Sequence, residues 1–302
     1  MVRIIDLECS LPRRANDPSG SGGAEAADLN ADATAPRSAV QQRPGYGMAN
    51  YGRIFRSRVD GDNRAAAMPM DDYVKKLAGL GIEKAIPFGA SNEETTELLR
   101  TYPGRFLGLA RLSPMRGMAG VRDLERLIRE EGFHALGVSA LVDCLPASDR
   151  RYYPLYAKAA ELGVPVRIYS TMNYANDRPY DLGHPRNLDQ VAMDFPELTI
   201  IGGLGGWPWV NDMVALVRRH PNLYLDTSAH RPKYLGQPGS GWEMLLQFGN
   251  TLIQDKVMVG LSTALIGQPH ETLIQEYLDL PLKDSVKEKW LFGNAARVFE
   301  IE

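Results

Sequence analysis

The stretch VRDLERLIREEGFHALGV, residues 121–138, contains the unit from which most of the chain is built. Its first part places apolar residues at helical spacing, Gly132 supplies the left-handed position that ends a helix, and residues 135–138 form a short apolar run. The stretch YYPLYAKAAELGVPVRIY, residues 152–169, has the same order, with Gly163 in the place of Gly132. A helix, a glycine and then a strand are typical of the connections within a parallel α/β sheet.

Apolar runs bounded by turn residues recur along the chain, with stretches of helical period between them. Eight such strands alternating with helices predict a (β/α)8 barrel. With 302 residues, 44% of them hydrophobic, the chain is long enough for one core of this size, so residues 1–302 are expected to form a single domain. The strands are expected at Arg3–Ile5, Lys84–Pro87, Phe106–Leu109, Ala135–Val138, Val164–Tyr169, Leu198–Ile201, Leu223–Leu225 and Val257–Leu261.

Residues 13–66 break this order, because they are rich in Ser, Ala, Gly and Asp and have no apolar period. They follow the first strand and therefore begin at the carboxyl ends of the strands, where barrel active sites lie. We expect a long and flexible insertion. It is either a plain surface loop or, since structureless loops of this length are uncommon in compact domains, a lid or an arm that contacts another subunit.

Charge and cysteine content exclude several classes of protein. A formal net charge of −3 without a basic face gives no reason to expect a nucleic-acid partner. No apolar run is long enough for a signal peptide or a membrane span, and the two cysteines, Cys9 and Cys144, form neither a disulfide framework nor a CxxC metal motif. A cytoplasmic location, without membrane association, is the expectation.

Five motifs together resemble amidohydrolase family 2, a family of metal-dependent barrel proteins. The resemblance covers nearly the whole chain apart from residues 13–66, and it implies the amidohydrolase-like barrel. The family includes aminocarboxymuconate-semialdehyde decarboxylase-like and resorcylate decarboxylase-like enzymes, with lactone hydrolases as neighbours. The motifs are IIDLECSLP at the start, DFPELTIIGGLGGWPW and NLYLDTSAHRPKYL in the second half, and DKVMVGLSTALIG and FGNAARVFEI near the end.

The same resemblance implies a divalent metal in the barrel, and here the sequence departs from the family. The first strand of relatives usually ends in Asp-x-His-x-His, but this chain has Glu8 and Ser10 at the two histidine positions. Glu8 remains a conceivable ligand, as in some decarboxylases of the family. Tyr169, Gly203 and Ser262 stand where relatives have His, His and Asp. With four of five ligands replaced, we expect no tightly bound metal and no other cofactor.

The histidines offer little to rebuild such a site. Two of them, His184 and His230, fall in loops on the catalytic side and, with Glu8, are conceivable ligands that no spacing motif supports. The other three fall near helix–strand junctions or within helices, where a solvated or locally hydrogen-bonded role is expected: His134, His220 and His270.

Alternation along strands predicts which side chains enter the barrel. Glu8 and Ser10 share one face, and the resemblance implies that it is the inner one, because the two histidines of relatives point into the barrel; Cys9 then faces the helices. On the fifth strand Arg167 and Tyr169 point inward together. A buried guanidinium requires a charged partner, and Glu8 is the candidate.

Two interpretations of this pair remain open. The Glu8–Arg167 pair either holds together a barrel without metal, or Arg167 binds a substrate carboxylate while Glu8 or Tyr169 exchanges a proton. Asp226 stands where relatives often have a structural Asp. In the second interpretation the residues expected to contact substrate are Ser10, Ser262, His230 and Asp226. Trp207 and Trp209 are expected to pack the sixth loop against a neighbouring loop or subunit.

Two functions follow from these expectations. The first is a metal-independent hydrolase or lyase that acts on a small carboxylated or lactone-like molecule, with decarboxylation, isomerisation or lactone opening favoured because hydrolysis without metal needs a strong base and an oxyanion partner. The second is a non-catalytic subunit that pairs with a metal-bearing homologue, since the fold motifs are kept while the ligands are lost. A homo-oligomer, or a hetero-oligomer with such a homologue, is the expected assembly.

Overall fold

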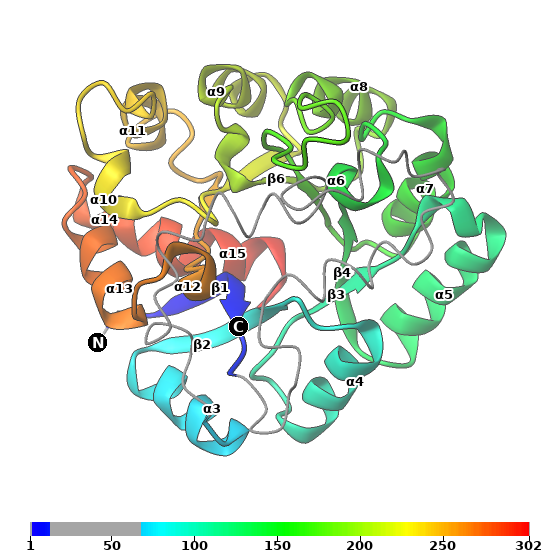
Figure 1. Ribbon diagram of the computed structural model, residues 1–302, viewed down its shortest axis with the longest axis horizontal. Coiled ribbons are helices and arrows are strands. Elements are labelled where there is room, and N and C mark those ends of the chain that lie inside the picture. Colours follow the sequence, from blue (N-terminus) through cyan, green and yellow to red (C-terminus); the bar gives the residue numbers. More distant parts are fainter. Residues whose placement is uncertain (1, 13–67, 302) are drawn as a thin grey trace.

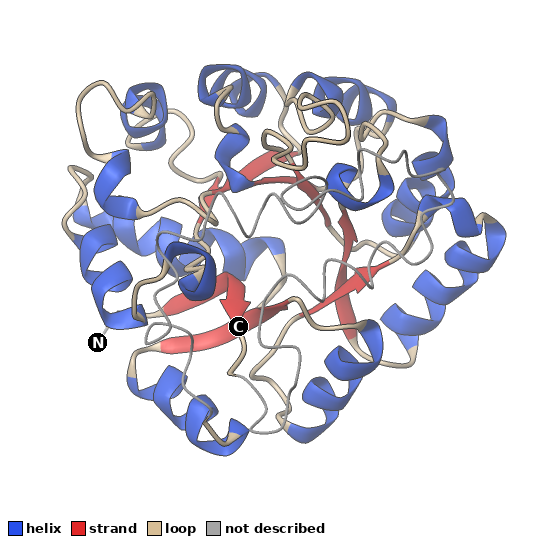
Figure 2. Ribbon diagram, viewed as in Figure 1, coloured by secondary structure: helices blue, strands red, loops and turns tan. Residues whose placement is uncertain are grey.

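Eight parallel strands form a ring with helices around its outside (Figures 1 and 2). The computed structural model describes residues 2–12 and 68–301; the predicted insertion, residues 13–66, lies outside the described residues. The strands are β1 (Ile4–Ser10), β2 (Ile82–Phe88), β3 (Gly108–Arg111), β4 (Phe133–Val138), β5 (Val166–Tyr169), β6 (Ile200–Gly203), β7 (Leu223–Asp226) and β8 (Val257–Met258).

Backbone hydrogen bonds close this ring. β1 pairs with β2, and β3 to β8 pair in chain order, all parallel. The Leu107 N–H donates to the Ala85 carbonyl at 2.9 Å and joins β2 to β3. The Leu7 N–H donates to the Val259 carbonyl at 3.0 Å and joins β8 to β1. The predicted (β/α)8 barrel is therefore confirmed.

The last strand is shorter than the predicted Val257–Leu261. β8 ends at Met258, although residues 259–261 continue beside β1. The Leu261 N–H donates to the Asp6 carboxylate at 2.7 Å and not to a strand carbonyl, so a side chain takes the place of the regular ladder.

The helices cover the ring with their apolar faces. In α5, for example, Val121, Leu124 and Leu127 are buried at helical spacing. The start of α4 is fixed by a capping box, in which Ser91 and Glu94 bond to each other's backbone N–H groups. The helices are α3 (Met70–Gly79), α4 (Asn92–Thr101), α5 (Met118–Arg129), α6 (Ala140–Asp143), α7 (Tyr153–Glu161), α8 (Arg186–Asp194), α9 (Val210–Arg219), α10 (Pro232–Leu235), α11 (Glu243–Gly249), α12 (Thr263–Ile266), α13 (His270–Leu278), α14 (Asp284–Glu288) and α15 (Asn294–Val298). In the described part of the chain, none is long and apolar enough to cross a membrane.

The glycines that the sequence placed after helices have the expected conformation. Gly132 follows α5 with φ +75°, and Gly163 follows α7 with φ +70°. Both values lie in the left-handed region, where a side chain is strained, so glycine is the residue that lets the chain turn directly into β4 and β5.

The barrel interior has its own apolar core, separate from the core between strands and helices. Ile5, Leu7, Leu109 and Met258 belong to it, and Phe299 after α15 joins the same cluster. The family-like motif near the C-terminus is structural: the Asn294 amide donates to the carbonyls of Gln254 and Val257, at 2.9 and 2.7 Å. The chain thereby anchors the start of β8 and leaves the other end of the ring, the barrel mouth, for polar residues.

Candidate active site at the barrel mouth

Arg167 on β5 is the centre of a buried charge network at the barrel mouth. Its Nε donates to Asp226 Oδ2 at 2.7 Å and its Nη2 donates to Glu8 Oε2 at 2.9 Å. All three side chains are at most 1% exposed. The predicted Glu8–Arg167 pair is present, and Asp226, at the end of β7, is a second carboxylate on the same guanidinium.

Asp226 is the more strongly held of the two carboxylates. Its Oδ1 also accepts from Arg167 Nη2 at 3.2 Å and from the backbone N–H groups of Ser228 and Leu204, at 3.0 and 3.2 Å. Burial opposes ionisation, but the Arg167 charge and these hydrogen bonds outweigh it and lower the pKa of Asp226. Asp226 therefore carries the negative charge that balances Arg167.

Glu8 is left as an excess carboxylate. Burial raises its pKa, although Arg167 acts in the opposite direction. Its Oε1 accepts from Ser262 Oγ at 3.0 Å, and the Tyr169 hydroxyl lies 3.5 Å from Oε2. One guanidinium cannot neutralise two carboxylates, so Glu8 is the group of this network that takes up a proton most readily.

Tyr169 lies at the end of β5 and is half-buried. Arg167 Nη1 is 3.4 Å from its hydroxyl, and burial followed by the Glu8 charge raises the pKa of Tyr169 to about 12. Arg167 and Arg111 oppose this rise. The phenol thus stays protonated at neutral pH and lies between Glu8 and the more exposed rim.

Arg111 is a residue of this mouth that the sequence reasoning missed. It ends β3 two residues after the inward-facing Leu109, so strand alternation places it on the inner face. Its guanidinium donates to the Pro87 carbonyl at a long 3.4 Å and is half-buried. The same alternation rule that selected Arg167 was the signal that would have found it.

Three of the residues expected to contact substrate use their polar atoms within the protein. Ser10 Oγ accepts from the Ala264 N–H at 3.0 Å, and Ser262 Oγ accepts from the Ala229 N–H at 2.8 Å while it donates to Glu8. His230 Nε2 lies 3.1 Å from the Leu204 carbonyl.

Backbone strain gathers at the same rim. Leu204, Ala229 and Ser262 follow β6, β7 and β8, and all three have positive φ, at 64°, 63° and 46°. Such conformations cost free energy in residues with a Cβ and cluster at functional sites. Here they let the three loops turn so that Ser262 reaches Glu8 and the Leu204 N–H reaches Asp226.

The tryptophans of the sixth loop pack against neighbouring loops, as predicted. Trp207 stacks on Tyr174 with ring centroids 6.2 Å apart, and Trp209 lies 4.3 Å from the His184 ring. His230 is enclosed by Trp207 and Trp242, with centroid distances of 6.2 and 4.8 Å. Burial lowers the pKa of His230 to about 4.

The remaining histidines are distributed as follows. His134 accepts from the Gly108 N–H at 3.2 Å and His220 lies 2.6 Å from Asp189, so both are hydrogen-bonded, but to residues of other elements and not locally as was expected. His270 was expected to be solvated or locally bonded, but it is only 5% exposed and lies against Tyr73. The sequence placed it near a junction without showing that α13 packs its first residue onto β1.

Comparison with known proteins places the chain in a family. The amidohydrolase family model matches residues 13–301, so the chain belongs to the amidohydrolase family. An uncharacterised TIM-barrel protein from Bordetella bronchiseptica is similar over 99% of both chains, with 24% identity and a TM-score of 0.71. 5-Carboxyvanillate decarboxylase from Sphingomonas paucimobilis is similar over 100% of both chains, with 16% identity and a TM-score of 0.67.

A third similar structure is a dihydroxybenzoic acid decarboxylase from a Polaromonas species, which was solved with bound manganese. It matches over 100% of this chain and 98% of its own, with 16% identity and a TM-score of 0.60. At these identities the likeness shows a shared fold.

The donor set that the described residues provide at this mouth does not fit a divalent metal. A Cβ on Gly203, where relatives have a histidine, would lie 3.5 Å from Arg167 Nε and from Asp226 Oδ2, so the guanidinium occupies the space beside it. Glu8 already binds that cation, which would repel a second one. His184 and His230 bond elsewhere, and among the described residues neither forms a ligand group with Glu8.

Proposed function

We propose that this protein is a metal-independent lyase of the decarboxylase type that acts on a small carboxylated aromatic molecule. The observation that carries the proposal is that two buried carboxylates share one guanidinium, which leaves Glu8 with a raised pKa beside a phenol at the rim. A carboxyl group with a raised pKa is suited to deliver a proton near neutral pH.

Substrate binding is assigned to the cations that face the rim. Arg167 uses Nε and Nη2 on Asp226, Glu8 and Ser228, so only its Nη1 edge, now 3.4 Å from the Tyr169 hydroxyl, is available to a ligand. The Arg111 guanidinium makes a single long hydrogen bond with the described residues, to the Pro87 carbonyl at 3.4 Å. A substrate carboxylate bound by Arg111 and the Nη1 edge would lie next to Tyr169.

Decarboxylation then needs one proton and no added oxidant or reductant. The bond between the carboxylate carbon and the ring carbon breaks, its electron pair stays on the ring carbon, and carbon dioxide leaves. That carbon takes a proton from Glu8 through the Tyr169 hydroxyl, and Glu8 regains a proton from water. Hydrolysis is less well served, because it needs a strong base to activate water. Two structural neighbours are named as decarboxylases of aromatic acids, which supports the substrate class.

The test is carbon dioxide release by the purified full chain after chelator treatment, with 5-carboxyvanillate and dihydroxybenzoates as substrates. Glu8→Gln is expected to lower kcat by at least about 100-fold with little change in KM, because it removes the proton carrier and keeps the shape. Glu83→Gln is the matched control, since Glu83 at the start of β2 forms an exposed pair with Arg3, at the opposite end of the strands from the mouth. Activity should fall as pH rises through the pKa of Glu8. Equal activity of Glu8→Gln and wild type, or no release with any substrate, would overturn the proposal.

A second candidate is a non-catalytic subunit that pairs with a metal-bearing homologue. It is favoured by the internal use of the polar atoms of Ser10, Ser262 and Asp226, which leaves few groups for a ligand. Co-expression with a homologue distinguishes the two functions. A stable complex in which only the homologue's active-site variants lose activity would support the subunit role.

A further inference from the structure

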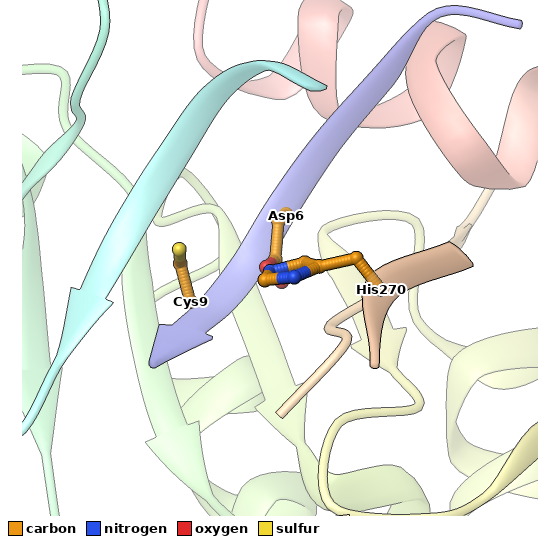
Figure 3. Close-up of side chains that lie close together, drawn as sticks. All are labelled: Asp6, Cys9 and His270. Carbon is orange, nitrogen blue, oxygen red and sulfur yellow. The ribbon is translucent and has the colours of Figure 1, made fainter. Parts of the chain in front are cut away.

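A second group of reactive side chains lies on the outer side of β1, between that strand and the helices. Asp6 and Cys9 come from β1, and His270 is the first residue of α13 (Figure 3). One ligand atom from each lies within 4.8 Å of the others, and all three residues are buried. Tyr73 of α3 completes the group: its hydroxyl is 3.3 Å from Cys9 Sγ and 3.4 Å from His270 Nε2.

The Tyr73 hydroxyl also donates to the Ser10 carbonyl at 2.6 Å, so one oxygen of Asp6 is the atom of this group that lacks a partner in the described part of the chain. Asp6 Oδ1 accepts from the Glu8 and Leu261 N–H groups, at 3.0 and 2.7 Å. Asp6 Oδ2 is buried and has no hydrogen-bond partner among the residues that the structure describes. A buried carboxylate oxygen without a partner is costly, so this oxygen requires a partner that the described residues do not supply.

The charges favour a divalent cation. Burial lowers the pKa of His270 to about 4, so its imidazole is neutral and has a lone pair to donate. Burial raises the pKa of Asp6 to about 6 and, with the Asp6 charge, raises that of Cys9. Without a cation, burial therefore keeps the Cys9 thiol protonated, whereas a divalent cation would displace that proton and be balanced by one carboxylate and one thiolate.

We propose that Asp6, Cys9 and His270 bind one divalent cation of the zinc class, with the Tyr73 hydroxyl or a water as the fourth ligand. A mixed sulfur, nitrogen and oxygen set is typical of tetrahedral zinc. Ligand atoms of such a site are roughly 3.3–3.8 Å apart, so the side chains close by about 1 Å on binding. This site is separate from the barrel mouth, because the β1 backbone lies between it and Glu8. Its role is structural: it ties β1 to α13 and α3.

Cobalt substitution tests the proposal on the full chain. Apo protein titrated with Co²⁺ is expected to bind one equivalent and to develop a thiolate-to-cobalt charge-transfer band together with the visible bands of tetrahedral cobalt. Zn²⁺ should displace the cobalt and remove both. Elemental analysis of protein purified without chelator gives an independent count of bound metal.

Variants assign the ligands. Cys9→Ser should lose the charge-transfer band, and His270→Asn and Asp6→Asn should each weaken cobalt binding by more than about tenfold. Cys144→Ser is the matched control, because Cys144 is the other free cysteine and lies after α6, and it should bind as wild type. Glu8→Gln should also bind as wild type. Circular dichroism identifies any ligand variant that fails to fold. In that case the remaining two ligand variants test the site.

Several outcomes would overturn the site. Cobalt binding without a thiolate band, or binding that Glu8→Gln abolishes, would place the ion in the barrel mouth. A band lost in Cys144→Ser would assign it to the wrong cysteine. No binding at all would mean that the group is a hydrogen-bonded cluster only. None of these results depends on turnover, so they are independent of the proposed lyase activity.

Discussion

The two sides of β1 bury carboxylates in different ways. On the inner side, Glu8 shares Arg167 with Asp226, and the chain itself supplies the cation. On the outer side, Asp6 has two backbone donors and no cation of its own, and one of its oxygens has no partner in the described structure. The inner carboxylates thus have a cation from the chain, whereas Asp6 has none among the described residues and requires a proton or the proposed metal.

A bulge in β1 makes this contrast possible. The register of β1 against β2 shifts between Asp6 and Cys9, so simple alternation fails within this stretch. Leu7 belongs to the inner core and the next residue, Glu8, also reaches into the barrel to bind Arg167. Asp6 and Cys9 lie on the opposite side with His270. Because of the extra residue in this bulge, the side chains of Leu7 and Glu8 enter the barrel, whereas those of Asp6 and Cys9 lie on the outer side of β1.

The largest effect is expected from removing the inner cation. Arg167→Met leaves Glu8 and Asp226 buried without a charge partner and should lower the free energy of unfolding by roughly 3–5 kcal/mol, measured by urea denaturation. Arg3→Met is the control, because Arg3 pairs with Glu83 at the surface, and little change is expected there. If Arg167→Met were as stable as the control, the inner network would contribute nothing to the fold.

A smaller effect is expected from crowding the inner network. Gly260 lies beside β1, and a Cβ there would come within 1.9 Å of Ser228 Oγ and 3.1 Å of the Glu8 Cβ. Gly260→Ala should therefore destabilise the protein by about 3 kcal/mol in thermal or urea unfolding. Gly79→Ala is the matched control, since nothing lies within 4 Å of its Cβ position. A Gly260 variant as stable as this control would show that the mouth can relax.

The smallest of these effects is a pH dependence at the rim. The pKa of His230 is about 4 in the folded protein and about 6.5 when unfolded, so below neutral pH the unfolded chain takes up the proton first. This difference costs no stability above about pH 7, and the free energy of unfolding falls by about 2 kcal/mol as pH drops from 7 to 5.

His230→Gln keeps a donor for the Leu204 carbonyl and does not titrate, so it should show less of this decline in urea unfolding between pH 7 and 4. The comparison of interest is the difference between wild type and variant at each pH, which cancels other titrating groups. A constant difference over this range would contradict the buried, neutral state of His230.

Much of the barrel and part of its mouth could be predicted from residues alone. The apolar runs and the glycines at 132 and 163 follow rules of local conformation, which act within a few residues, so the order of strands and helices was accessible. Alternation likewise placed Arg167 and Tyr169 on one face of β5, and the resemblance to the family placed Glu8 inside the barrel. Arg111 was missed because the predicted third strand ended at Leu109, two residues before it. The raised pKa of Glu8 was not accessible either, because it depends on how Asp226 competes for the same guanidinium.

By itself, the sequence determined that the chain forms a (β/α)8 barrel and that a buried arginine on β5 requires an acidic partner, because periodicity and the cost of an unpaired buried charge are properties of the residues themselves. Only the tertiary structure decided which carboxylates meet Arg167 and that His270, more than 250 residues from Cys9 in the chain, lies beside it. Such partners come from distant segments, and their distances and shared burial are set by closure of the ring and by the bulge in β1.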